Sequence, residues 1–160
     1  MMSIEVYDDD TDSIINNQII LKNCLSRLKA LAEIQTYSNG KMLLNDILED
    51  NSYYDLILLD IEMPDISGME LVQAIKPALP NVKVIFITSH VKYAIDSFEL
   101  SIFRYVPKND LDKRLTYAVT DALKLIMLED DKSYTVLTAN RMEKVRYSDI
   151  LYILRDGKNA

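Results

Sequence analysis

The sequence predicts an α/β protein with a doubly wound, five-stranded parallel sheet and a short C-terminal β segment. Three observations indicate this fold class. Strand-like and helix-like segments alternate regularly from the N-terminus to about residue 128. Two strand candidates, 55–59 and 82–87, are apolar almost throughout, which is typical of parallel strands buried on both faces. After a polar break at residues 129–133, short strand candidates follow one another without a helix.

The five strand candidates of the first part are short and rich in Ile, Val, Leu and aromatic residues. They are Ile4–Tyr7, Ile34–Tyr37, Asp55–Leu59, Val82–Ile87 and Phe103–Val106. A helix-like segment follows each of them. Right-handed crossovers between successive strands then place helices on both faces of one parallel sheet.

The helix candidates begin at capping or turn residues. Asp12 is expected to cap the first helix, which extends to about Ala30 and buries Cys24 as a small core residue. The next two run from Gly40 to Leu48 and from Gly68 until the prolines at 77 and 80 end the helix. The last two cover 91–100 and about 110–128. The fifth helix has one apolar face, formed by Leu111, Leu115, Ala118, Ala122 and Ile126.

Composition excludes several classes of protein. An apolar fraction of 49% in 160 residues is enough for one packed core, and no stretch has the roughly 20 apolar residues of a membrane span. The N-terminus has no signal-peptide pattern, and a single cysteine cannot form an internal disulfide. We therefore expect a cytoplasmic protein without a membrane partner. The net charge of −7 disfavours nucleic-acid binding by the chain as a whole.

Acidic residues follow two of the predicted strands. Asp8, Asp9 and Asp10 come directly after the first strand, and Asp60 follows the third. The carboxyl ends of parallel strands meet at one edge of a sheet, which is where ligands of open α/β sheets bind. Clustered carboxylates repel one another and need a cation, and oxygen ligands suit Mg2+. The sequence therefore predicts a magnesium site that can support phosphoryl transfer.

Residues 1–128 resemble the receiver domain of a two-component response regulator. The features that carry the resemblance are the pair Asp8-Asp9, Asp60 with Met63-Pro64 and Gly68, Thr88, Tyr105 and Lys108. They occur in the family's order and at the matching strand ends. The resemblance implies a flavodoxin-like sheet with strand order 2-1-3-4-5.

The resemblance also implies the metal ligands and the phosphoacceptor. Asp60 would be the phosphoacceptor and would contact Mg2+. Asp9 would bind the metal directly, Asp8 largely through water, and Glu62 through its backbone carbonyl. The side chain of Glu62 adds negative charge at the mouth of the site, and its effect on phosphoryl lifetime has no predicted sign.

Three further residues have roles implied by the resemblance. Lys108 would pair with phosphoryl oxygens, and Thr88 would donate a hydrogen bond from its hydroxyl to one of them. The side chain of Tyr105 would point inward or outward depending on phosphorylation. One departure concerns Lys108, because proline precedes it here whereas receivers usually have proline after it. His90 is expected to be an ordinary loop residue, and Asp10 a solvated one.

The C-terminal segment, residues 134–160, resembles the opening strands of a LytTR-type DNA-binding domain. The similarity is clearest over residues 147–153, and residues 86–99 also resemble receivers of that class. Its strand candidates are Tyr134–Thr138, Glu143–Tyr147 and Ile150–Leu154. A whole LytTR domain is much longer, so DNA contact is expected only through a complete C-terminal domain that is mostly absent here. Residues 129–133 would be the linker.

The sequence thus predicts a signalling switch rather than an enzyme that turns over outside substrates. Its expected partners are a sensor histidine kinase and, on activation, a second copy of the chain, with transcription controlled by the full-length regulator. The alternatives are a Mg2+-dependent phosphatase with an aspartate nucleophile, and an interaction module that does not depend on phosphorylation. Phosphatases of this kind need a second aspartate two residues after the first, and this chain has Glu62 at that position. Three glycines without a P-loop pattern disfavour a nucleotide hydrolase.

Overall fold

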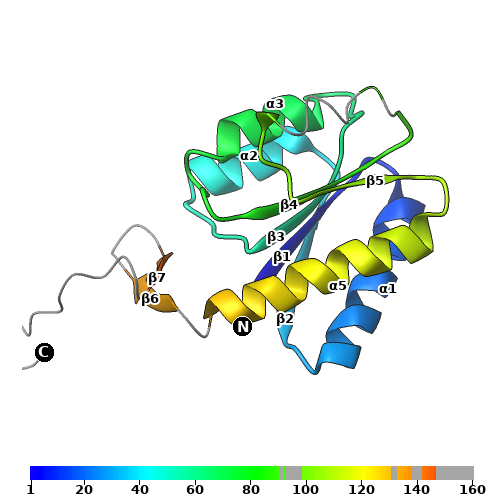
Figure 1. Ribbon diagram of the computed structural model, residues 1–160. Coiled ribbons are helices and arrows are strands. Elements are labelled where there is room, and N and C mark those ends of the chain that lie inside the picture. Colours follow the sequence, from blue (N-terminus) through cyan, green and yellow to red (C-terminus); the bar gives the residue numbers. More distant parts are fainter. Residues whose placement is uncertain (91, 93–98, 131–132, 138–141, 147–160) are drawn as a thin grey trace, which may run out of the picture.

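A computed structural model describes residues 1–90, 92, 99–130, 133–137 and 142–146. Its centre is a five-stranded sheet with the order β2-β1-β3-β4-β5, and all of its neighbouring strands are parallel (Figure 1). The strands are β1 (Met2–Tyr7), β2 (Ala32–Tyr37), β3 (Leu56–Asp60), β4 (Lys83–Thr88) and β5 (Arg104–Pro107). The predicted fold class and strand order are confirmed, with strand ends that differ from the predicted ones by one or two residues.

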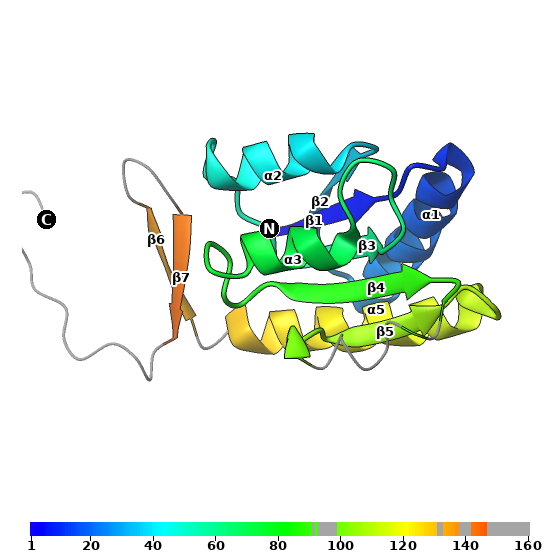
Figure 2. The ribbon, with the colours of Figure 1, turned by 90° about the horizontal axis from the view of Figure 1, so that it is seen from above.

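Helices cover both faces of the sheet, as a doubly wound fold requires. On one face lie α1 (Thr11–Leu28) and α5 (Leu111–Asp130), and on the other lie α2 (Gly40–Leu48) and α3 (Gly68–Ile75) (Figures 1 and 2). The helix predicted over residues 91–100 falls mainly outside the described residues. None of the described helices is both long and apolar enough to traverse a bilayer.

The two faces of the sheet have separate cores. Beneath α1 and α5, aliphatic side chains of alternate strand positions, such as Ile4 and Val6, pack against Leu21, Cys24 and Leu123. Cys24 is buried, in agreement with its predicted role as a core residue. Beneath α2 and α3, the core contains larger aromatic side chains. Its buried aromatic members are Tyr7, Tyr54 and Phe86.

The start of α1 differs from the prediction. Asp10, not Asp12, is the N-cap residue, and its side chain accepts a hydrogen bond from the Ser13 amide at 3.1 Å. Asp12 lies in the first turn, where an acidic side chain still interacts favourably with the helix dipole. The helix ends at Leu28, because Lys29 adopts a left-handed conformation with φ 53°. Asp10 is exposed, as expected, but it has a structural role.

The described part of the C-terminal segment is a two-stranded antiparallel sheet. It comprises β6 (Ser133–Leu137) and β7 (Met142–Arg146), which do not join the five-stranded sheet. These strands match the first two candidates of the tail within one residue. The third candidate, Ile150–Leu154, lies outside the described residues.

Candidate functional site

The carboxyl edge of the sheet gathers the three predicted acidic residues. Carboxylate oxygens of Asp8, Asp9 and Asp60 all lie within 4.8 Å of one another. Asp8 and Asp60 are buried, with 1% and 5% of their surface exposed, whereas Asp9 is open to solvent. Strands β1 and β3 are direct neighbours, so their ends place these groups together without any contribution from distant loops.

The electrostatics of this cluster favour a bound cation. Burial raises the pKa of Asp8 to about 6. The amide of Asp10 and the charge of Lys108 oppose this rise in pKa, while the charges of Asp60 and Asp9 add to it. Two buried carboxylates and an exposed one, all with oxygen donors, fit the preference of Mg2+ for hard, anionic ligands.

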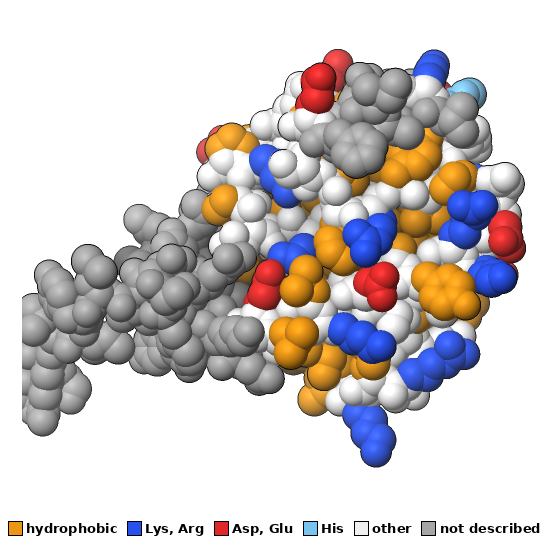
Figure 3. Space-filling view, viewed as in Figure 1, with side chains coloured by type: hydrophobic (Ala, Val, Ile, Leu, Met, Phe, Trp, Pro, Cys, Tyr) orange, Lys and Arg blue, Asp and Glu red, His pale blue; other side chains and the backbone are white. Residues whose placement is uncertain are grey.

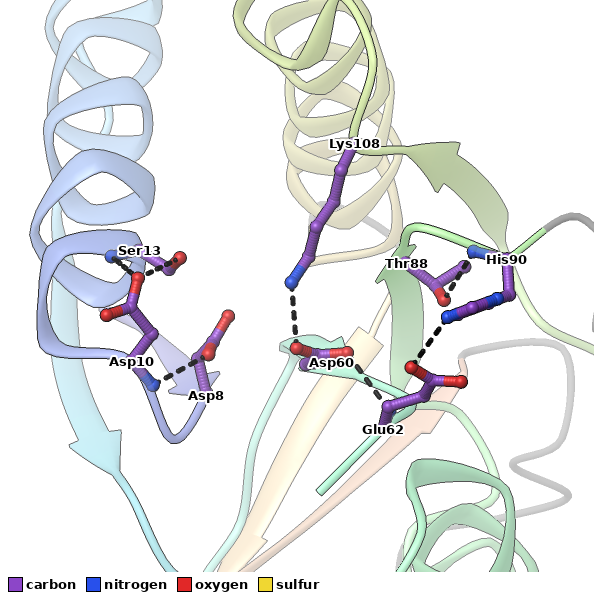
Figure 4. Close-up of polar contacts among 8 residues, drawn as sticks. All are labelled: Asp8, Asp10, Ser13, Asp60, Glu62, Thr88, His90 and Lys108. Carbon is purple, nitrogen blue, oxygen red and sulfur yellow. Dashed lines mark hydrogen bonds and ion pairs between the residues drawn. The ribbon is translucent and has the colours of Figure 1, made fainter. Parts of the chain in front are cut away.

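Lys108 reaches the cluster from the end of β5. Its Nζ lies 2.9 Å from Oδ2 of Asp60 (Figure 4). Its main-chain N–H donates to the carbonyl of Thr88 at 2.9 Å. Burial alone would lower the pKa of the Lys108 amine, but the hydrogen bond and charge of Asp60, with Asp8 and Asp9, raise it above its usual value. The altered position of proline in this loop therefore leaves the lysine within the site.

The turn after β3 is built around Asp60 and Gly68. The amide of Glu62 donates to Oδ1 of Asp60 at 3.0 Å, and the amide of Gly68 donates to the carbonyl of Ile61 at 2.8 Å. A Cβ atom on Gly68 would lie 2.7 Å from the Asp60 carbonyl oxygen and 2.8 Å from the Ile61 Cα atom. Glycine is therefore required sterically, because the first turn of α3 passes against the backbone of the phosphoacceptor candidate.

The predicted switch residues Thr88 and Tyr105 both bond to His90. Oγ1 of the buried Thr88 accepts a hydrogen bond from the His90 amide at 3.2 Å. The hydroxyl of the half-buried Tyr105 donates to the His90 carbonyl. The His90 ring is paired in turn with Glu62, with Nε2 and Oε2 2.8 Å apart (Figure 4). His90 lies in the loop after β4, as predicted, and its contacts connect the switch residues to the turn after β3.

Two side-chain contacts near the site were not predicted from the sequence. The Glu62–His90 pair is one, and the other joins the hydroxyl of Tyr7 to Asp65 at 3.1 Å. The only sequence signal for the first is that Glu62 and His90 each stand two positions beyond a site residue, Asp60 and Thr88. The second has no local signal, because it joins residues 58 positions apart.

Comparisons with known proteins agree with this geometry. The sequence profile of the response regulator receiver domain matches residues 5–120. The chain is 34% identical over 112 residues to the transcriptional regulatory protein NatR of Bacillus subtilis, covering 69% of the chain and 48% of NatR. It is 32% identical over 128 residues to the sensory transduction protein LytR of Staphylococcus epidermidis, covering 76% of the chain and 50% of LytR.

A solved structure shares the fold. The BeF3-activated receiver domain of DrrB, from Thermotoga maritima, has a TM-score of 0.62 and 28% sequence identity to the chain. The match covers 78% of this chain and 99% of that domain. By contrast, the chain spans only about half the length of the curated relatives that it matches.

Proposed function

The chain belongs to the response regulator receiver family, and we propose that its Asp60 accepts a phosphoryl group from a sensor histidine kinase in the cytoplasm. The observation that carries this proposal is the constellation around Asp60. A buried carboxylate stands beside two further acidic residues and 2.9 Å from the amine of Lys108. In this role the protein is a switch rather than an enzyme acting on outside substrates.

The residues of the site suit in-line phosphoryl transfer. A carboxylate oxygen of Asp60 would attack the phosphorus of a phosphohistidine, and the P–N bond would break as the new P–O bond forms, with the electron pair leaving on the imidazole. Asp8, Asp9, Asp60 and the Glu62 carbonyl would hold Mg2+. The bound ion would supply positive charge against the oxygens of the transferred group. From the opposite side, the Lys108 ammonium would neutralise negative charge on the same phosphoryl oxygens.

Thr88 and Tyr105 would convert the modification into a change of surface. Thr88 accepts a hydrogen bond from the His90 amide, so its own proton can be donated to a phosphoryl oxygen. A shift of Thr88 toward that oxygen would move His90, whose carbonyl accepts the Tyr105 hydroxyl. A covalent group at Asp60 would thereby bias the position of Tyr105.

The test is adduct formation at Asp60. Incubation with Mg2+ and a small phosphodonor, or with beryllofluoride, should give one adduct per chain by mass spectrometry or fluorine NMR. Asp60→Asn should abolish it, while Asp12→Asn, which changes an exposed acidic side chain in the first turn of α1, should leave it intact. Repeated hydrolysis of phosphomonoesters would favour a phosphatase instead. The absence of any wild-type adduct would favour a phosphorylation-independent interaction module.

We further propose that activation pairs two copies of the chain and that residues 134–160 begin a LytTR-type DNA-binding domain of a transcription regulator. Support comes from the names of the relatives and from exposed apolar side chains on α5 at Tyr117, Leu125 and Leu128. Figure 3 shows hydrophobic side chains among Lys and Arg on the side where α5 lies. Sedimentation of the full-length regulator with and without beryllofluoride tests pairing, and equal masses in both states would contradict it.

A further inference from the structure

Three segments that are distant in sequence meet beside the acidic cluster. Tyr7 is the last residue of β1, Lys41 lies in the first turn of α2, and Asp65 belongs to the loop between β3 and α3. The carboxylate of Asp65 accepts the Tyr7 hydroxyl at 3.1 Å through Oδ1 and the Lys41 amide at 3.1 Å through Oδ2. We call this arrangement of Tyr7, Asp65 and the Lys41 amide the Asp65 clamp.

The clamp is tightly packed at its centre. Tyr7 has 1% of its surface exposed. A Cβ atom on Gly40, the first residue of α2, would lie 2.4 Å from the Tyr7 hydroxyl oxygen and 2.3 Å from Cγ2 of Ile66. The backbone of α2 therefore lies directly against these two side chains, and a side chain at residue 40 would force one of them to move. This contact leaves the loop little freedom to slide along α2.

Asp65 itself is exposed, yet its charge is directed into the clamp. Partial burial would raise the pKa of its carboxyl, but the amides of Ile66 and Lys41 and the Tyr7 hydroxyl lower the pKa below its usual value. Asp65 is therefore ionised near neutral pH and acts only as an acceptor. Its hydrogen bonds to an amide at a helix N-terminus and to a phenol are charge-assisted, which makes them stronger than neutral ones.

The clamp joins both protein segments that form the metal side of the site. Tyr7 directly precedes Asp8, and Asp65 lies three residues after Glu62 in the same loop. The loop is also fixed at its base, where the Gly68 amide donates to the Ile61 carbonyl at 2.8 Å. The loop is thus anchored at Ile61 and at Asp65, and Glu62 lies between these two points, so both anchors set the position of its carbonyl.

We propose that Asp65 is a positioning residue, which holds the turn after β3 against the end of β1 so that the metal ligands are arranged before the cation binds. The inference rests on the proposed magnesium site. Outer-shell groups that orient ligands affect metal affinity without contacting the metal. Because coupling is reciprocal, occupation of the site should in turn alter the hydrogen bond between Asp65 and the Lys41 amide at the start of α2.

The chain supplies a matched control for this test. Tyr54 is also 1% exposed, lies in the same core, and bonds through its hydroxyl to a carboxylate, that of Asp46, at 2.6 Å. Tyr7→Phe and Tyr54→Phe therefore remove the same atom from similar surroundings, but only the first lies in the clamp. Asp65→Asn is the second variant, and its exposed position allows the chain to fold if Tyr7→Phe does not.

Magnesium titration by calorimetry should show a dissociation constant raised about tenfold in Tyr7→Phe and in Asp65→Asn, and unchanged in Tyr54→Phe. The two clamp changes combined should weaken binding no more than either alone, because each opens the same contact. In nitrogen-15 spectra of the wild type, Mg2+ should shift the Lys41 amide resonance, and this shift should be lost in Asp65→Asn.

The outcomes separate the two proposals. A wild-type chain that binds neither Mg2+ nor beryllofluoride overturns the proposed function together with the clamp's role. A wild type that binds both, with clamp variants of equal affinity and no response at the Lys41 amide, overturns the clamp alone. Equal weakening in Tyr54→Phe also overturns it, because the effect would then come from general loosening of this core.

Discussion

The side of the sheet under α1 and α5 buries aliphatic residues and one cysteine, whereas the side under α2 and α3 also buries tyrosines and places polar groups among them. On the second side, the hydroxyl of Tyr54 contacts Asp46, that of Tyr7 contacts Asp65, and that of Tyr105 contacts His90. Two of these three contacts end in the loops beside Asp60. The aliphatic side therefore provides stability, while the polar side also connects the phosphoacceptor candidate to the rest of the fold.

The buried acid Glu5 is the clearest example of the difference between the two sides. It alternates along β1 with Ile4 and Val6 of the aliphatic core and is fully buried on the α2 side. Neither of its side-chain oxygens has a hydrogen-bond partner of normal geometry in the described part of the chain. Burial, with the charge of Asp46, raises its pKa to about 10, and nearby main-chain amides offset this only in part. An acid here reduces stability at neutral pH.

The largest effect is expected from a cavity on the aliphatic side. Leu21→Ala, at a fully buried position of α1, should lower the free energy of unfolding by about 2–5 kcal/mol. The loss should be equal at pH 5 and pH 8, because no carboxyl, imidazole or amino side chain belongs to that core. Urea denaturation at both pH values measures it. Native-state adduct formation at Asp60 should persist, and its loss would show that the two sides are not independent.

The second-largest expected effect is a gain in folding stability from a substitution on the polar side of the sheet. An unfolded Glu ionises near its usual pKa of 4.5, whereas folded Glu5 keeps its proton until about pH 10. The folded state therefore binds more protons over this interval, and stability falls as pH rises from about 5 toward 10. Glu5→Gln removes the ionisation and should match the wild type at pH 4 but exceed it by on the order of 1–3 kcal/mol at pH 7.

Denaturant titrations at several pH values test this gain. Glu33→Gln is the matched control, because it makes the same chemical change at an exposed position of β2. It should leave the pH profile unaltered. A constant difference between Glu5→Gln and the wild type from pH 4 to pH 9 would show that the buried acid is not the source of the pH dependence.

A smaller effect concerns proton competition at the metal site. Protonation of Asp8, whose pKa is raised to about 6, removes one anionic ligand from the cluster. Magnesium affinity should therefore decline below pH 6, by at most about tenfold per pH unit for a single proton. Calorimetry between pH 5 and pH 8 measures the slope. Asp8→Asn should bind more weakly without this slope, whereas Asp12→Asn should keep the wild-type profile.

Much of this arrangement was predictable because it depends on local pattern and on sheet geometry. Apolar runs locate β3 and β4, and neighbouring parallel strands bring Asp8 and Asp60 to one edge wherever their exact boundaries fall. The position of Lys108 was also predictable in outline. Its contact with Asp60 survives the altered proline because the lysine still follows β5 at the same edge.

The features that could not be predicted depend on contacts that no local sequence pattern encodes. Asp10 and Asp12 are the same residue type two positions apart, so only the backbone at the start of α1 decides which one is the cap. Alternation along β1 places Glu5 opposite Ile4 and Val6, but its complete burial depends on how other segments cover that face. The partner of Glu62, His90, is supplied by a loop at the end of a different strand.

The smallest expected effect comes from removing the C-terminal segment. β6 and β7 pair only with each other in the described structure, so neither face of the five-stranded sheet should depend on them. A chain ending at Asp130 should unfold within about 0.5 kcal/mol of the full chain and should still form the adduct at Asp60.

The cut must fall after Glu129, whose carboxylate pairs with Lys83 at the start of β4 at 3.0 Å, with side chains 30% and 12% exposed. A chain ending at Leu128 is therefore the matched control and should be less stable than the Asp130 chain, because the amine of Lys83 loses its charged partner. Thermal melting of both truncated chains and of the full chain compares their stabilities. If the Asp130 chain melted well below the full chain, residues 131–160 would contribute to the receiver core, and its two faces would not be sufficient for stability.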